Sequence, residues 1–154
     1  MHADRDDRRE WLEADGLGGF ASGTISGIRT RRYHAVLLSA ATPPTGRQVF
    51  VAGLEADVTA GDSTWAISSQ RYAPDVIHPD GITRLESFAI DPWPQWTFRL
   101  RDGLTIEQSL FVPRGLPGGT AIAGLRNISI RLWLSGPKKG WVAKNSCKLV
   151  ITRV

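Results

Sequence analysis

The chain has 154 residues, of which 42% are hydrophobic and 22% charged, and this composition is typical of one globular domain. Its apolar runs are far shorter than the roughly 20 residues that a membrane-spanning helix needs. The charged start, residues 1–10, lacks the apolar core of a secretion signal, and the single cysteine, Cys147, excludes an internal disulfide. These features predict a cytoplasmic protein without a membrane partner.

The net charge of +4 is distributed unevenly along the chain. Residues 1–107 contain eleven arginines and all fifteen acidic residues, whereas residues 108–154 contain four arginines, four lysines and no acidic residue. All four lysines lie within residues 138–154. A basic tail can bind nucleic acid or an anionic membrane. The abrupt change from arginine to lysine favours the alternative, a foreign or frameshifted end, so nucleic acid is not an expected partner.

The first part of the chain combines charged, glycine-rich and apolar segments. Residues 1–9 are charged, have no periodicity and are expected to be disordered. Residues 10–13 form either a helical turn or the start of a strand. Gly18 and Gly19 predict a loop. Residues 30–38 alternate and then become apolar, which predicts a strand.

The rest of the chain is rich in short β-type runs. Residues 71–81 are expected to be irregular because they contain Pro74 and Pro79. The clearest hairpin joins 95–100 to 104–112 through a short Asp-Gly turn. The other predicted strands are 48–58 with an interruption at Gly53, 64–68, 83–91, and one or two within 120–134.

Seven or eight short strands, about ten residues apart and without a convincing helix, predict an all-β fold. The connections are too short for helical crossovers, so the strands are expected to be antiparallel. We therefore predict an antiparallel β-sandwich over residues 10–137, followed by the basic tail at 138–154.

Common reactive motifs are missing. No histidines or cysteines have metal-ligand spacing, so neither a metal nor a cofactor is expected. Residues 16–19 lack the Lys-Ser/Thr and the strand-to-helix context of a phosphate loop. Ser22, Ser26 and His34 are close in sequence, but no nucleophile-elbow pattern surrounds them. A pair of catalytic carboxylates stays open as an alternative, because such a pair is defined in space.

The run Arg31-Arg32-Tyr33-His34 concentrates side chains that bind ligands. On a strand, Arg31 and Tyr33 would face one side, and Arg32 and His34 the other. An aromatic ring with arginines suits a sugar or a carboxylate on a partner domain. The alternative is a solvated strand edge with a buried tyrosine.

Residues 10–38 resemble the opening of the N-terminal domain of the prokaryotic-type glycogen debranching enzyme (amylo-α-1,6-glucosidase) family. That family has Glu-Trp-Leu, then Gly-Leu-Gly-Gly-Phe/Tyr, then Gly-Thr, then Thr-Arg-Arg-Tyr-His. The corresponding residues of this chain are 10–12, 16–20, 23–24 and 30–34. The resemblance covers about residues 10–115 and ends by 115–119.

The resemblance implies a large super-sandwich that precedes a catalytic (α/α)₆ barrel. The catalytic carboxylates belong to the barrel, so this chain is expected to contain no catalytic residue and to be inactive alone. A sandwich that ends here is expected to be incomplete at its C-terminus, with the barrel and an α-glucan such as glycogen as its partners. The residues carried over as substrate-cleft or domain-interface positions are Arg31, Arg32, Tyr33, His34, Gly18 and Gly19.

The alternative function is a free-standing carbohydrate-binding β-sandwich. The loop Trp93-Pro94-Gln95-Trp96 motivates this hypothesis. In it, exposed Trp93 and Trp96 would be platforms on which sugar rings stack.

Overall fold

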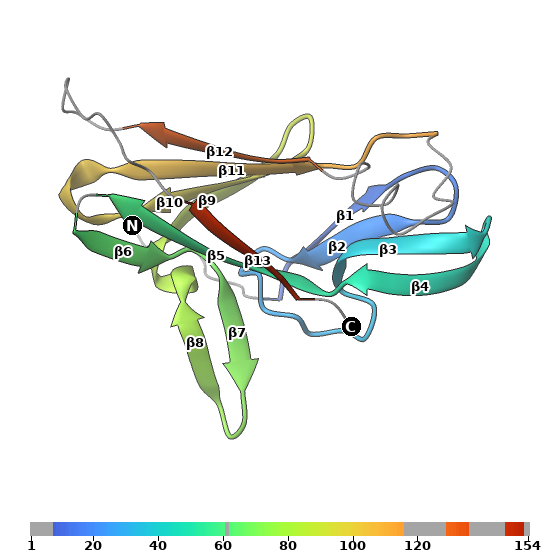
Figure 1. Ribbon diagram of the computed structural model, residues 1–154, viewed down its shortest axis with the longest axis horizontal. Coiled ribbons are helices and arrows are strands. Elements are labelled where there is room, and N and C mark those ends of the chain that lie inside the picture. Colours follow the sequence, from blue (N-terminus) through green and yellow to red (C-terminus); the bar gives the residue numbers. More distant parts are fainter. Residues whose placement is uncertain (1–7, 61, 116–128, 136–146, 153–154) are drawn as a thin grey trace.

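The computed structural model describes residues 8–60, 62–115, 129–135 and 147–152 (Figure 1). These residues form thirteen β-strands and two short 3₁₀ helices, with no α-helix in the described ranges. All paired strands are antiparallel. The predicted all-β, antiparallel fold is confirmed. Neither of the two helices in these ranges is long or apolar enough to cross a membrane.

The first sheet is a meander in which each strand pairs with its neighbour in the chain. Its strands are β1 (Glu10–Ala14), β2 (Phe20–Thr24), β3 (Ala35–Thr42) and β4 (Thr45–Val51). Strand β1 alternates, so that Trp11 is buried while Leu12 faces outward. Gly23 lies opposite Trp11, and a Cβ there would be 3.4 Å from the indole ring. The glycine therefore leaves room for the tryptophan.

The second sheet has the strand order β12-β11-β10-β9. Its strands are β9 (Leu85–Ile90), β10 (Pro94–Arg99), β11 (Thr105–Phe111) and β12 (Ser129–Ser135). The 3₁₀ helix η2 (Arg101–Gly103) joins β10 to β11, and Gly103 takes the positive φ of 71° that this turn needs. The predicted hairpin is thus confirmed.

A third sheet has the order β13-β5-β6. Its strands are β5 (Gly53–Ala60), β6 (Ser63–Ala66) and β13 (Cys147–Thr152). The predicted strand 48–58 is in fact divided at Ala52 between β4 and β5. Strand β13 lies in the lysine-rich tail and pairs with β5. That the tail is foreign stays a prediction. Residues 1–9 were expected to be disordered, and residues 1–7 lie outside the described ranges.

A two-stranded hairpin, β7 (Ser69–Tyr72) and β8 (Val76–Asp80), projects from the body of the molecule (Figure 1). The prediction that residues 71–81 are irregular is wrong. Pro74 occupies the turn, and Pro79 lies in a strand with a neighbour on one side only. Proline is tolerated at both kinds of position. The short 3₁₀ helix η1 (Gly81–Arg84) then leads into β9.

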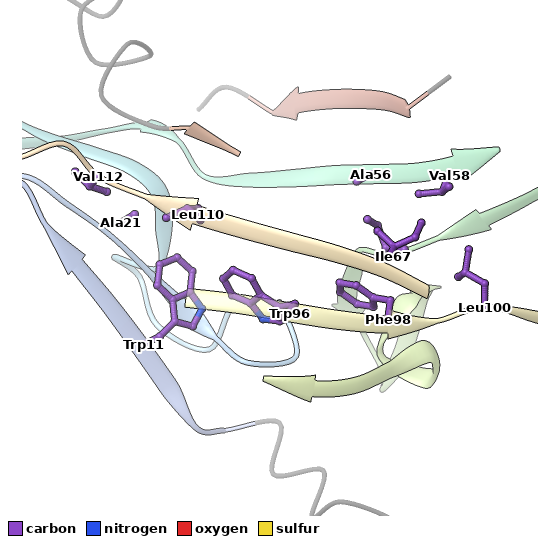
Figure 2. Packing of buried hydrophobic residues seen from close by; sticks show 11 residues of the cluster. Trp11, Ala21, Ala56, Val58, Ile67, Trp96, Phe98, Leu100, Leu110 and Val112 are labelled. Carbon is purple, nitrogen blue, oxygen red and sulfur yellow. The ribbon is translucent and has the colours of Figure 1, made fainter. Parts of the chain in front are cut away.

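The core lies where the second sheet packs against strands of the first and third sheets. Figure 2 shows the residues of this cluster, with Trp11 of β1 beside Trp96 of β10. The two indole rings meet edge to face, with centroids 5.3 Å apart, and Phe88 packs against Trp96 at 5.1 Å. The indole N–H of Trp96 donates to the Ile25 carbonyl at 2.9 Å. Aromatic packing and this hydrogen bond therefore connect the two sheets.

Candidate functional site

Residues 31–34 form a turn that precedes β3, which begins at Ala35. The His34 N–H donates to the Arg31 carbonyl at 3.1 Å and closes the turn. The prediction of a strand from residue 30, with alternating sides, is therefore wrong. Arg31, Arg32 and Tyr33 are all exposed, whereas His34 is 5% exposed. The turn thus presents three side chains outward and anchors itself through the fourth.

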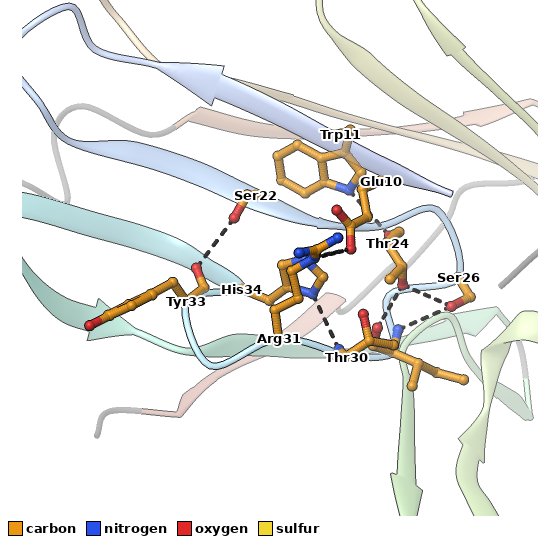
Figure 3. A network of polar contacts seen from close by, with 10 residues as sticks. Glu10, Trp11, Ser22, Thr24, Ser26, Thr30, Arg31, Tyr33 and His34 are labelled. Carbon is orange, nitrogen blue, oxygen red and sulfur yellow. Dashed lines mark hydrogen bonds and ion pairs between the residues drawn. The ribbon is translucent and has the colours of Figure 1, made fainter. Parts of the chain in front are cut away.

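The imidazole of His34 is held on both sides (Figure 3). Its Nδ1 accepts the Thr30 N–H at 3.2 Å, and its Nε2 lies 3.4 Å from Oε1 of Glu10. Burial lowers the pKa of His34, and the Glu10 carboxylate only partly opposes this effect. Because Nδ1 is an acceptor, the neutral ring carries its proton on Nε2, facing Glu10.

Glu10 joins the turn to the first strand of the chain. Its Oε1 accepts a hydrogen bond from Nε of Arg31 at 2.5 Å. This hydrogen bond lowers the pKa of Glu10, so the carboxylate stays ionised near neutral pH. Glu10 was not predicted as a site residue, because Arg31 is 21 positions away from it in the sequence. We call Glu10, Arg31 and His34 the turn cluster.

The preceding loop is held by small hydroxyl side chains. Thr24 Oγ1 donates to the Ile28 carbonyl at 2.6 Å, and Ser26 Oγ accepts the Ile28 N–H at 3.2 Å. Ser22 Oγ donates to the carbonyl of Tyr33 at 3.3 Å. These hydroxyls thus fix the backbone of the loop that leads to the turn and the backbone of Tyr33 within it.

An open hollow lies beside the turn cluster. Its lining includes Phe20 and Ser22 of β2, all four residues of the turn, and Glu10, Trp11 and Leu12 of β1. Leu12 is 59% and Tyr33 54% exposed, and the Arg32 guanidinium lies 5.8 Å from the centroid of the Tyr33 ring. The rim therefore combines exposed apolar surface with cations and one carboxylate. Such a rim can bind hydroxyl groups, carboxylates and ring faces.

Gly18 and Gly19 lie outside the lining of this hollow and have packing roles. Gly18 has φ of +101°, and a Cβ there would be 2.7 Å from the Pro44 carbonyl oxygen. A Cβ at Gly19 would be 2.4 Å from Oδ2 of Asp15 and 2.9 Å from the Leu38 carbonyl oxygen. Close approach of backbone thus accounts for glycine at both positions.

Asp15 organises this glycine loop, a role that was not predicted from the sequence. Its buried carboxylate accepts the N–H groups of Leu17 at 2.7 Å and Gly19 at 2.9 Å. An aspartate whose carboxylate accepts the N–H two residues further on forms an Asx turn, and the position of Asp15 directly before Gly16 was the available signal.

The two tryptophans of the alternative function differ in exposure. Trp96 is 5% exposed and belongs to the core, so the expectation that it is an exposed stacking platform is wrong. Trp93 is half-buried, with its ring against Phe111 at a centroid distance of 5.4 Å. Alternation along β10 places Trp96 inward, and this burial leaves Trp93 alone as a candidate platform.

Acidic, histidine and cysteine side chains do not gather into a metal centre in the described parts of the chain, where no group of three or more such residues occurs. The turn cluster itself offers one carboxylate and one imidazole, and the Arg31 cation occupies the carboxylate. A divalent cation would have to displace that arginine, so the cluster suits recognition better than metal binding.

Comparison with known proteins identifies a family. The family model described as glycogen debranching enzyme N terminal matches residues 9–140, which is most of the chain. No curated protein and no solved structure matches. The matched range contains the glycine loop, the turn cluster and strands of all the sheets, and it extends past residues 115–119. The chain therefore belongs to the glycogen debranching enzyme N-terminal domain family.

Proposed function

We propose that this chain is a non-catalytic domain that supports the (α/α)₆ catalytic barrel of a cytoplasmic glycogen debranching enzyme, an α-1,6-glucosidase. In this proposal the turn cluster and its hollow contact the barrel and border the cleft that holds the α-glucan. The observation that carries the proposal is the anchored turn, in which buried His34 and the more exposed Glu10 carboxylate support exposed Arg31, Arg32 and Tyr33.

Anchoring lowers the entropic cost of binding. A turn held by the hydrogen bonds of His34 and Arg31 loses less conformational freedom when a partner binds than a free loop would lose. The network therefore holds the exposed side chains of the turn in place before a partner binds.

The composition of the exposed rim supports contact with another protein surface. Tyrosine and arginine are enriched in interface cores, where a ring supplies area and a guanidinium supplies directed hydrogen bonds. Tyr33 and Leu12 both exceed half exposure, and Arg32 lies over the tyrosine ring. A carboxylate or hydroxyl of the barrel, or a glucose unit of the glucan, fits these groups.

The test combines the 154-residue chain with a separately produced barrel domain of a prokaryotic-type debranching enzyme. The chain alone is expected to release no glucose from a branched limit dextrin, and it is expected to co-purify with the barrel. Tyr33→Ala should weaken this association about tenfold, the loss expected of an aromatic interface anchor. Glucose release by the chain alone would contradict the proposal.

A matched control separates the interface from general surface effects. Arg32→Ala should also weaken association with the barrel, whereas Arg114→Ala, an exposed arginine outside the hollow, should leave it unchanged. If the Arg32→Ala and Arg114→Ala variants bind the barrel equally well, the turn does not belong to the interface.

A further inference from the structure

A second hollow lies away from the turn cluster and shares no lining residue with it. It forms where β6, η1, η2 and the end of β10 meet. The residues of its lining that matter here are Ser63, Thr64, Trp65, Arg84, Arg99 and Arg101. Three arginines from separate elements thus border one open space.

Arg84 is held in a defined position at this hollow. Its guanidinium makes two bonds to the Asp80 carboxylate, from Nη1 to Oδ1 at 2.7 Å and from Nη2 to Oδ2 at 3.3 Å. Nη1 also donates to the Ala66 carbonyl at 3.3 Å. The hydrogen bonds that Arg84 donates to the carboxylate lower the pKa of Asp80, so the ion pair persists at neutral pH. The cation is therefore oriented before any ligand arrives.

Arg99 is oriented in the same way by Glu86, which accepts hydrogen bonds from its Nε, at 3.0 Å, and its Nη2. A guanidinium has five N–H donors, and these bonds leave the Nη1 amino group of Arg99 for another acceptor. Arg101 is exposed, and no acidic side chain pairs with it within the described residues. The three guanidinium groups at the hollow thus have more N–H donors than the neighbouring carboxylates accept.

Among the ion pairs of the described residues, the carboxylates of Asp80 and Glu86 neutralise Arg84 and Arg99, and none of these pairs involves Arg101. Within this part of the chain, Arg101 therefore adds a positive charge to the hollow, beside guanidinium N–H groups of Arg84 and Arg99 that their carboxylates do not occupy. The hydroxyls of Ser63 and Thr64 add short polar groups at the same rim. A compact anion with several oxygen acceptors can use all of these groups together.

We infer that this hollow binds a phosphate-type oxyanion, free or carried on a sugar, through Arg101 and the oriented guanidinium groups of Arg84 and Arg99. Trp65 also lines the hollow and is partly buried against the core cluster. Because Trp65 lines the same hollow as the three arginines, its indole can supply apolar surface for the ring of a phosphorylated sugar. The inference does not depend on the proposed function of the turn cluster.

The experiment is a titration of the full 154-residue chain, labelled with ¹⁵N, followed by amide chemical shifts at constant ionic strength. The probes are inorganic phosphate, glucose 1-phosphate and glucose. Both phosphates are expected to give saturable shifts confined to residues near 63–65, 83–84 and 99–101. Tighter binding of glucose 1-phosphate, with a shift of the Trp65 indole N–H, identifies a sugar phosphate; equal binding identifies free phosphate. Glucose alone should shift none of these signals.

Substitution of Arg101 decides the inference. Arg101→Ala should raise the Kd for phosphate about tenfold, the loss of one charge-assisted contact, while Arg101→Lys should have an intermediate effect. Arg114→Ala, exposed and outside the hollow, is the control and should bind as the parent chain does. Shifts without saturation, or an unchanged Kd in the Arg101→Ala chain, would overturn the inference.

Discussion

Replacement of Trp96 by phenylalanine tests whether the contact between the sheets controls stability. The indole N–H of Trp96 donates to the Ile25 carbonyl at 2.9 Å in a buried position. Phenylalanine leaves this carbonyl without its partner, which costs about 1–3 kcal/mol. The smaller ring also leaves a void of roughly 40 Å³, worth about 1 kcal/mol at 24 cal/mol per Å³. We expect Trp96→Phe to lower the free energy of unfolding by about 2–4 kcal/mol.

The assay is urea unfolding at 25 °C followed by circular dichroism, because fluorescence would change with the number of tryptophans. Trp93→Phe is the matched control, since the ring of Trp93 is half-buried against Phe111. It should cost under about 1 kcal/mol. If the two variants lose equal stability with unchanged m values, Trp96 does not connect the sheets in the manner described.

Two further substitutions test the glycine loop and the turn cluster. Gly19→Ala should lower the free energy of unfolding by about 2–4 kcal/mol, because its Cβ would meet Asp15 and backbone. Gly53→Ala, with open space around its Cβ, should lower it by under about 1 kcal/mol. Equal losses of the two variants in urea unfolding would contradict this reasoning. Folding lowers the pKa of His34, so the unfolded chain binds more protons and stability falls as pH drops below about 6.5. When the free energy of unfolding is measured between pH 7.5 and 5.5, it should fall more steeply with decreasing pH in the parent chain than in the His34→Gln variant. Parallel curves for the two chains would refute this role of His34.

The sequence could predict those strands whose pattern is local. Strands β10 and β11 alternate clearly and flank a short Asp-Gly turn, so their hairpin was predicted with the correct partners. The hairpin β7–β8 was missed because Pro74 and Pro79 were interpreted as breakers. Whether a proline breaks a strand depends on the neighbours of that strand, and local sequence does not contain this information.

The candidate site shows the same limit. Residues 31–34 were predicted as part of a strand because residues 30–38 alternate and then become apolar. Their turn depends on the bond between Thr30 and His34 and on Glu10, which is 21 residues from Arg31. Side chains of the kinds that bind ligands could thus be recognised from the sequence, but the carboxylate of Glu10, which positions them, could not.

The contact between Trp96 and Ile25 has a consequence for folding kinetics. Strands β1–β4 pair with chain neighbours, as do β9–β11, so each meander can form from local contacts. The two meanders pack together only when Ile25 and Trp96, which are 71 residues apart in the sequence, come into contact, and we expect this step to limit the folding rate. The projecting hairpin β7–β8 lies inside the closing segment. Because each doubling of loop length costs only about 0.6 kcal/mol, the tip of this hairpin should accept inserted residues with little effect on either rate or stability.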